Sequence, residues 1–227
     1  MKKQKSTIFQ QSKAFTLAEV LITLMIIGII ASIVIPSLMQ TLEKNALKGQ
    51  IKRELAILEE ALKLTLLDND YKCFYEYKNG VWVGTSRSDC PDFFNKFYTK
   101  LKIMRFCKGN SLAQGCIPQY SGLLESYASC PEFSKNKVNT TNYSRVLIDG
   151  TIIMQLAIDN YPLIAVDVNG MKPPNIQGRD VIVLRIDKDV NTEKISIISS
   201  GIGLNSCSTA FGSAVDRYFN TVQDLYK

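Results

Sequence analysis

Twenty consecutive residues near the N-terminus, from Val20 to Met39, carry no charged side chain. A helix of about 20 apolar residues is long enough to cross the hydrocarbon core of a bilayer. Residues 1–14 contain four lysines and no acid, and positive charge usually marks the side of a span that stays in the cytoplasm. We therefore expect a single-pass anchor with a cytoplasmic N-terminus and an exported C-terminal part.

The cysteines all lie beyond the apolar segment. An even number of cysteines in an exported region indicates a disulfide framework, although reduced cysteines in a cytosolic core are the alternative. Only eight residues separate Cys107 from Cys116, which makes them the best candidates for a local pair. The six disulfide candidates are Cys73, Cys90, Cys107, Cys116, Cys130 and Cys207.

Composition argues against two classes of function. The chain contains no histidine, which removes the commonest general base and the commonest transition-metal ligand. Residues 1–14 supply four of the +6 formal charges, so charge gives little support to nucleic-acid binding by the remainder. We expect no catalytic residues and a protein that is not an enzyme, with a single-span exported enzyme kept as an alternative.

One carboxylate, Glu19, lies at the start of the apolar segment. A lone carboxylate at membrane depth costs free energy and therefore usually marks a functional position. A secretory signal peptide has its small-residue cleavage site after its apolar core, whereas Ala14 precedes the apolar segment here. Cleavage at Ala14 would leave the anchor on the mature protein.

The segment from Ala14 to Glu19, Ala-Phe-Thr-Leu-Ala-Glu, resembles the processing site of the prepilin family, which includes type IV pilins and the pseudopilins of type II secretion systems. The resemblance implies that prepilin peptidase cuts between Ala14 and Phe15 and methylates the new amine of Phe15. Glu19 would then set the register of assembly by pairing with the Phe15 ammonium of a neighbouring subunit. The family more often has glycine before the cut, so Ala14 is a departure from its pattern.

Two further positions match the family's helix-weakening residues, Gly28 and Pro36. Proline costs about 3 kcal/mol in a helix interior and glycine about 1 kcal/mol relative to alanine. The resemblance therefore implies a kink or local melting between them. The alternative is that both residues are merely tolerated in a membrane helix.

An amphipathic helix follows the apolar segment and predicts an α+β fold with pilin-like architecture. Its apolar residues recur every three or four positions, which is the period of a helix face packed on a sheet. The stripe consists of Leu47, Ile51, Leu55, Leu58, Leu62 and Leu66. The expected organisation is a leader at 1–14, a transmembrane and filament-core helix at 15–39, an amphipathic helix at 40–70 and a disulfide-stapled head at 71–227.

Strand signals begin at about residue 144, where Asp149-Gly150 separates two β-rich runs as a two-residue hairpin turn does. The predicted antiparallel sheet contains strands at 145–148, 151–158, 163–168, 181–186 and 195–198. Residues 71–142 are predicted to be irregular, with one helix at about 93–103. Trp82 lies in an aromatic cluster there, and core filling is favoured over an exposed contact surface.

The loop from 167 to 180 is rich in oxygen ligands and is a candidate calcium site, with Asp167, Asn169, Asn175 and Asp180 as ligands. Its spacing departs from an EF-hand, because Lys172 stands where that pattern has glycine. The favoured alternative is a turn in which Asp and Asn side chains cap backbone amides. We expect no certain cofactor, with calcium as the one candidate.

Together these features predict a filament subunit, a pseudopilin or minor pilin, anchored in the inner membrane with its head periplasmic or extracellular. The resemblance implies other pilin-like subunits, prepilin peptidase and an inner-membrane assembly platform as partners. Secretion, pilus and DNA-uptake systems share these N-terminal features, and an adhesin head is a further alternative.

Overall fold

The computed structural model describes residues 16–120, 143–155, 162–176 and 179–199. Within these ranges the chain forms two helices and eight strands. The helices are α1 (Leu17–Asp68) and α2 (Cys90–Thr99). The strands are β1 (Phe74–Lys78), β2 (Val81–Ser86), β3 (Ile103–Lys108), β4 (Tyr143–Leu147), β5 (Ile152–Gln155), β6 (Leu163–Asp167), β7 (Val181–Asp189) and β8 (Ile195–Ser199).

The chain divides into two units, residues 1–43 and 44–227, and each is described by itself. The first unit contains the N-terminal part of α1, whose apolar side chains are exposed along its length. Among the described residues, α1 is the one helix long and apolar enough to cross a membrane, judged by length and composition. It is helical throughout, so there is no melted segment between Gly28 and Pro36.

Hydroxyl groups in this first unit bond back to their own helix. Thr23 Oγ1 donates to the carbonyl of Val20 at 2.9 Å, and Ser32 Oγ donates to the carbonyl of Ile29 at 2.7 Å. A hydroxyl bonded in this way needs no water, which suits a helix in an apolar medium.

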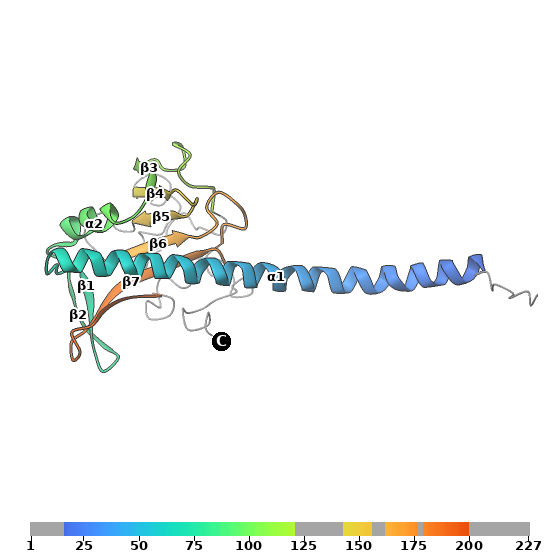
Figure 1. Ribbon diagram of the computed structural model, residues 1–227, viewed down its shortest axis with the longest axis horizontal. Helices are drawn as coiled ribbons and strands as arrows, with labels where there is room; N and C mark the ends of the chain where they lie inside the picture. Colours follow the sequence, from blue (N-terminus) through green and yellow to red (C-terminus); the bar gives the residue numbers. More distant parts are fainter. Residues whose placement is uncertain (1–15, 121–142, 156–161, 177–178, 200–227) are drawn as a thin grey trace, which may run out of the picture. The chain divides into compact units, whose positions relative to one another are not determined.

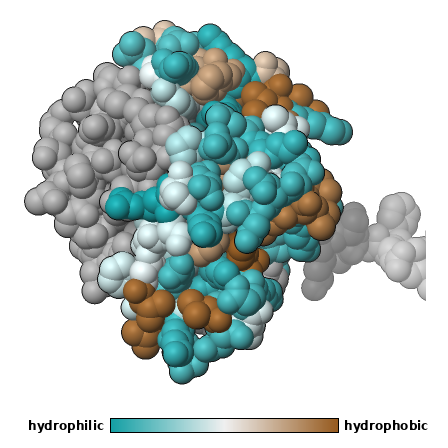
Figure 2. Space-filling model, turned by 90° about the vertical axis from the view of Figure 1, so that its left-hand side faces the viewer, coloured by the Kyte–Doolittle hydropathy of each residue, from teal (hydrophilic) through white to brown (hydrophobic). Residues whose placement is uncertain are grey.

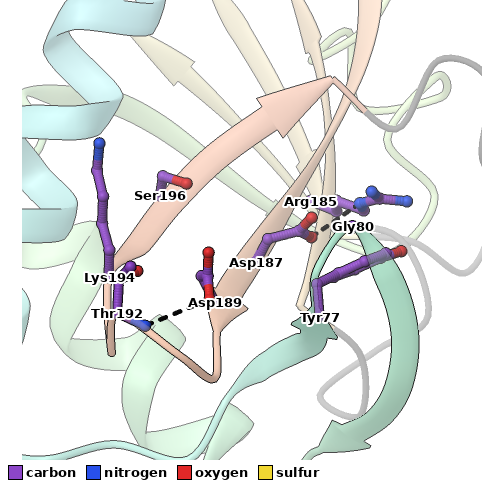
Figure 3. Close-up of a pocket in the computed structure, with 8 residues that line it drawn as sticks. All are labelled: Tyr77, Gly80, Arg185, Asp187, Asp189, Thr192, Lys194 and Ser196. Carbon is purple, nitrogen blue, oxygen red and sulfur yellow. Dashed lines mark hydrogen bonds and ion pairs between the residues drawn. The ribbon is translucent and has the colours of Figure 1, made fainter.

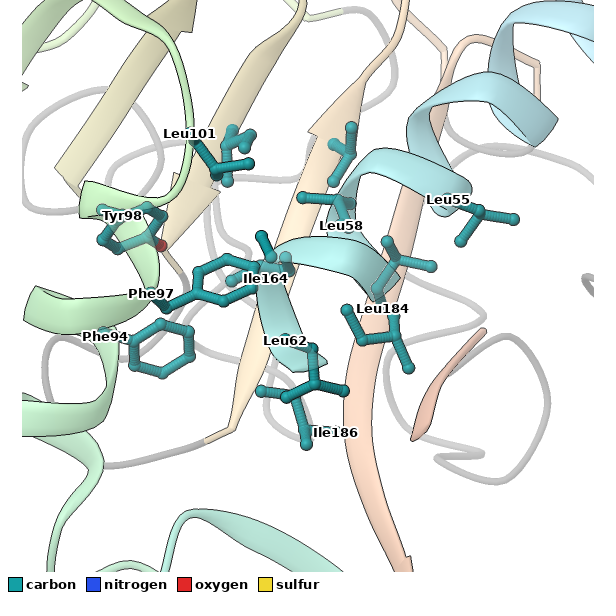
Figure 4. Packing of buried hydrophobic residues seen from close by; sticks show 14 of the residues in the cluster. Leu55, Leu58, Leu62, Phe94, Phe97, Tyr98, Leu101, Ile164, Leu184 and Ile186 are labelled. Carbon is teal, nitrogen blue, oxygen red and sulfur yellow. The ribbon is translucent and has the colours of Figure 1, made fainter. Parts of the chain in front are cut away.

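In the second unit, the remainder of α1 carries the predicted apolar stripe. Its first five members, Leu47, Ile51, Leu55, Leu58 and Leu62, are buried, whereas Leu66 is only partly buried. Figure 4 shows leucines of this stripe beside the α2 aromatic rings and the strand residues Ile164, Leu184 and Ile186. The prediction of a helix face packed on a sheet is confirmed.

One sheet organises the second unit, with the strand order β2-β1-β7-β6-β5-β4-β3 and with β8 also pairing with β7. Figure 1 shows the strands running from β3 at the top to β2 at the bottom. The neighbouring strands are antiparallel except β1 and β7, which are parallel. The antiparallel sheet predicted from residue 144 onward is confirmed for β4 to β8, and the chain before it adds three more strands.

The prediction that residues 71–142 are irregular is wrong for residues 74–108, which contain β1, β2, α2 and β3, and is confirmed for residues 109–120, which contain no helix or strand. Asn79 and Gly80 have φ values of 52° and 77°, as the two central residues of a type I′ turn do, and they join β1 to β2. The helix predicted at 93–103 begins earlier, because Pro91 suits the first helical turn, and it ends at Thr99. The following residues form β3.

The middle strands of the sheet, β5, β6 and β7, are buried on both faces. One core cluster contains side chains of α1, α2 and one face of the strands. A second cluster on the other face joins β5, β6 and β7 to Cys107, Cys116, Ile117 and Tyr120. The segment after β3 therefore covers the face of the sheet that α1 does not.

The described residues contain two disulfides, between Cys73 and Cys90 and between Cys107 and Cys116. The second is the local pair predicted from the spacing. Cys130 and Cys207 lie outside the described residues, so their oxidation stays a prediction.

Candidate assembly site and the acidic loop after β6

The start of α1 is set by a reciprocal pair of side chains, Thr16 and Glu19. The Thr16 amide and Thr16 Oγ1 both donate to Glu19 Oε2 at 2.9 Å, and the Glu19 amide donates to Thr16 Oγ1 at 3.2 Å. This is a capping box, in which a threonine and a glutamate three residues later satisfy amides that a helix N-terminus leaves unpaired. It explains why the helix begins at Leu17.

The capping box holds the Glu19 carboxylate at the exposed helix N-terminus, where the helix dipole favours negative charge. Within the described part of the chain, the hydrogen bonds to this carboxylate come from Thr16 alone, and an acceptor oxygen can accept from a second donor. The carboxylate is therefore able to accept an ammonium group from another chain. Ala14 and Phe15 lie outside the described residues, so their roles stay predictions.

The packing of this chain does not explain Gly28. A Cβ atom added there would meet nothing within 4 Å, apart from the helix's own nearby backbone. Pro36 lies inside the same exposed part of α1. Whatever selects these residues is therefore not a close contact within the described part of this chain.

Comparison with known proteins bears on this N-terminal segment. Residues 10–35 match the family model of the prokaryotic N-terminal methylation motif. The chain carries this methylation motif. The matched range includes Ala14, Phe15, Glu19 and Gly28 and ends just before Pro36.

The similar proteins share the same region. Type II secretion system core protein G of Klebsiella pneumoniae is 40% identical over 60 residues, which is 26% of this chain and 42% of the relative. The protein of the same name from Escherichia coli K12 is 39% identical over 61 residues, 27% of this chain and 41% of the relative. The chain thus spans less than half the length of these curated relatives, in its N-terminal part. No solved structure matches the chain.

The predicted calcium loop begins where β6 ends. The Asp167 carboxylate is buried and accepts hydrogen bonds from the Tyr120 hydroxyl at 3.0 Å and from the Gly170 amide at 2.9 Å. The Asp180 carboxylate is also buried and accepts from the amides of Asn175 and Ile176 at 2.7 and 2.8 Å. These bonds form the turn that the alternative interpretation predicted.

Burial raises the proton affinity of both carboxyl groups. Burial is the largest cause that raises the pKa of Asp167, and the neighbouring Asp180 adds to it, so that the pKa reaches about 8. Burial also raises the pKa of Asp180, although the backbone amides that it accepts oppose the shift. At neutral pH the loop therefore retains a proton or benefits from a cation.

The remaining predicted ligands lie in the same loop. Asn169 Nδ2 donates to the carbonyl of Pro173 at 3.1 Å, while Asn169 Oδ1 is buried without a hydrogen-bond partner. Asn175 contributes its amide to Asp180. Among the described residues there is no cluster of three or more His, Cys, Asp or Glu side chains arranged for a metal. The carboxylates of Asp167 and Asp180 and the amide oxygen of Asn169 are the types of ligand that a hard cation such as calcium prefers.

A polar pocket of about 390 Å³ lies between the β1–β2 and β7–β8 hairpins, as Figure 3 shows. In its lining Arg185 Nε forms an ion pair with Asp187 Oδ1 at 2.8 Å, and the guanidinium carbon lies 4.7 Å from the centre of the Tyr77 ring. Burial raises the pKa of Asp187 to about 6, and Arg185 opposes this shift. Asp189 accepts from the turn amide of Asn191 at 2.8 Å.

The side chains that line the pocket do not form a catalytic arrangement. Its acidic groups pair with an arginine or cap a turn, and no nucleophile is hydrogen-bonded to a base among its lining residues. Trp82 nearby is 59% exposed, so the expectation that it fills the core is wrong. The Asn79-Gly80 pair was the sequence signal for this exposure, because it indicates the turn of a short hairpin, and the second strand of that hairpin lies outside the core.

Proposed function

We propose that this chain is a subunit of a type II secretion or type IV pilus-like filament, a pseudopilin or minor pilin, and not an enzyme. The observation that carries the proposal is the first unit of α1. It bears the methylation motif and exposes an apolar surface that no described part of the chain covers. Lipid covers such a surface before assembly, and the same helices of neighbouring subunits cover it afterwards.

Processing comes first in this proposal. Prepilin peptidase removes residues 1–14 by cutting between Ala14 and Phe15, and the new amine of Phe15 is methylated. The anchor stays on the mature chain, with its N-terminus on the cytoplasmic side of the inner membrane and its head outside. Mass spectrometry of protein recovered from filaments should find an N-methylated Phe15, and an intact leader there would refute this step.

Glu19 supplies the register of assembly. In the separate subunit its carboxylate is held by the capping box with Thr16. On docking, the ammonium of a neighbour's Phe15 offsets that carboxylate in surroundings that solvate neither group well, which favours one axial position over the others. Gly28 and Pro36 serve contacts between neighbouring helices.

Replacement of Glu19 tests this role. Glu19→Val should leave the head folded and the anchor inserted, because loss of a carboxylate makes the helix better suited to lipid. Assembly should fail, since one unpaired buried charge costs about 3 to 5 kcal/mol. The measurement is the fraction of protein in sheared filaments relative to membranes, at matched expression and with leader cleavage checked separately.

Glu59→Val is the matched control, because it removes an exposed carboxylate from the same helix beyond the apolar segment. It should enter filaments as the wild type does. Equal incorporation of Glu19→Val would withdraw the assembly role. The relatives named as core protein G favour a secretion-type assembly, with homologous subunits and an inner-membrane platform as partners.

Calcium binding by the acidic loop is a second proposal. Two observations support it. A divalent cation would neutralise the buried carboxylates of Asp167 and Asp180, and it would give the buried Asn169 Oδ1 the partner that this oxygen lacks. Calcium should raise the thermal midpoint of the head, magnesium should do so less, and Asp180→Asn should remove the difference. An unchanged midpoint at millimolar calcium would refute it.

A further inference from the structure

The polar pocket between the β1–β2 and β7–β8 hairpins lies on the face of the sheet opposite α1. Successive residues of a strand point to opposite faces. Leu184 and Ile186 pack in the cluster that contains α1, so Arg185 and Asp187 point to the other face, where they line the pocket. Sites for small ligands usually have volumes of about 300 to 1,000 Å³. At about 390 Å³ this pocket is large enough for such a ligand.

Hydrogen bonds between the two hairpins hold the walls of the pocket in place. The Val190 amide donates to the carbonyl of Tyr77 at 2.8 Å, and Asn191 Nδ2 donates to Asn79 Oδ1 at 2.8 Å. Parallel pairing of β1 with β7 joins the same two hairpins. A ligand would therefore meet a preformed site, which lowers the entropic cost of binding.

The charges in the lining of the pocket cancel. The cations are Arg185 and Lys194, and the acids are Asp187 and Asp189. Arg185 and Asp187 have side chains that are 9% exposed and lie 2.8 Å apart, but Arg185 Nε and Asp187 Oδ1 have no hydrogen-bond partner. No carboxylate in the described ranges pairs with Lys194. A charged ligand would meet repulsion as well as attraction, which favours an uncharged one.

The lining offers both hydrogen-bond donors and acceptors. Arg185 and Lys194 can only donate, and an ionised Asp187 can only accept. Figure 3 shows Asp187 between Ser196 on one side and Arg185 on the other. A ligand hydroxyl both donates and accepts, so it suits every one of these neighbours. Three further hydroxyl groups in the lining do the same, those of Tyr77, Thr192 and Ser196.

An exposed aromatic ring lies beside this polar lining. Tyr77 pairs across the β1–β2 hairpin with Trp82, and directly paired residues point to the same face of a sheet. Trp82 is more than half exposed. Figure 2 shows apolar atoms at the bottom of the molecule, at the height of this hairpin in Figure 1. The indole ring offers a flat apolar surface to a ligand that also reaches the polar groups.

We propose that this pocket binds a sugar unit of an uncharged glycan. A pyranose ring carries hydroxyl groups at its edge and C–H groups on its faces. The hydroxyl groups bond to Arg185, Asp187 and the other polar lining groups, while one C–H face packs on Trp82. The binding site belongs to the head alone, so the proposal goes beyond the filament function and does not depend on it.

The chain provides its own reporter, because Trp82 is its single tryptophan. The probes are maltohexaose, cellohexaose and chitohexaose, titrated into the full chain in a detergent without a sugar headgroup. At least one of them should change the fluorescence of Trp82 saturably, and polyglutamate should not. The proposal would be overturned by no saturable change with any of the three at millimolar concentration, or by an equal response to polyglutamate.

A substitution that fills the pocket tests the place of binding. Thr192→Arg should weaken the apparent affinity at least about tenfold, because the longer, charged side chain occupies the space of the ligand. Thr192 is exposed and only its amide bonds to Asp189, so formation of both native disulfides should persist. Thr99→Arg is the matched control, because Thr99 is exposed at the end of α2 and does not line the pocket.

A second variant keeps the test independent of how Thr192→Arg folds. Lys194→Met should weaken the affinity about threefold, which corresponds to the loss of one hydrogen bond. Both effects with a wild-type affinity for Thr99→Arg would support the pocket. Unchanged affinity in Lys194→Met and in a folded Thr192→Arg, or an equal loss in Thr99→Arg, would overturn it.

Discussion

The two parts of α1 share one secondary structure and differ in almost everything else. Residues 44–68 bury one stripe of leucines and isoleucines in the head and expose charged residues on the other side. Residues 17–43 expose apolar side chains all round, and no described part of the chain packs on them. The sequence of this one helix therefore suits two different surroundings, the core of the head and an apolar medium.

This difference separates what the fold needs from what assembly needs. A side chain in the second part contributes to the stability of the head through contacts that are present in the single chain. A side chain in the first part has no such contacts with the described head, so under the proposed function its effect should appear in the membrane or in the filament. Substitutions in the two parts should accordingly change different measurements.

The largest expected effect comes from a matched pair of isoleucines. Ile51 is fully buried and Ile33 is exposed, although both lie in α1. Ile51→Ala should lower the unfolding free energy of the head by about 2 to 5 kcal/mol, because it leaves a cavity. Ile33→Ala should change it by less than about 0.5 kcal/mol. Pulse proteolysis of the full chain in detergent measures both, and similar losses would break the comparison.

Next in size is the disulfide near the end of α1. Cys73 and Cys90 close a loop of 17 residues, and loop entropy predicts a loss of about 3 kcal/mol when both become serine. The bridge between Cys107 and Cys116 closes 9 residues and should contribute slightly less, about 2.6 kcal/mol. Unfolding in urea of the two double variants, each compared with wild type, measures the order. A larger loss for the shorter loop would contradict the entropic account.

The acidic loop should make the head less stable as pH rises. Folding raises the pKa of Asp167 to about 8 from its ordinary value near 3.8, so between these values the folded state holds a proton that the unfolded state releases. Stability from this group is present at pH 4 and is lost as pH approaches 8. The urea midpoint without calcium should therefore fall from pH 5 to pH 8, and Asp167→Asn should flatten this dependence. A midpoint that rises over this range in the wild type alone would oppose the assignment.

The smallest effect is expected at the surface where α1 ends. Asp68 accepts from Lys100 at 2.7 Å and pairs with Lys96 at 3.1 Å, and all three side chains are in contact with solvent. Lys100→Ala should cost less than about 1 kcal/mol, because Lys96 remains and exposed pairs are weak. Adding salt should shrink this difference further. A loss comparable to that of Ile51→Ala would mean that this end of the helix is more tightly coupled to the core than its exposure indicates.

Local signals predicted the local parts of the molecule. The period of the leucines identified the packed face of α1, the Asp149-Gly150 pair identified a hairpin, and the short spacing identified one disulfide. The N-terminal motif was readable because its residues are contiguous. Each of these features is decided by residues that lie close together in the sequence.

Features that depend on distant partners were missed. The parallel pairing of β1 with β7 has no local signature, so residues 71–142 looked irregular. The buried Asp167 accepts a hydrogen bond from Tyr120, which belongs to a distant segment of the chain. The spacing of residues in the loop does not predict this contact. The exposure of Trp82 is likewise decided by where the sheet ends.

The parallel pairing of β1 with β7 also constrains the order of folding. Tyr75 meets Asp187, roughly 110 residues later in the chain, so this part of the sheet cannot form until most of the head is available to fold. Until then the β1–β2 hairpin has only its own turn and the nearby disulfide to hold it. A chain that emerges slowly therefore presents this hairpin, with the apolar side chains of Val81, Trp82 and Val83, to its surroundings for the whole interval. Chaperones and proteases would meet this hairpin before β7 does.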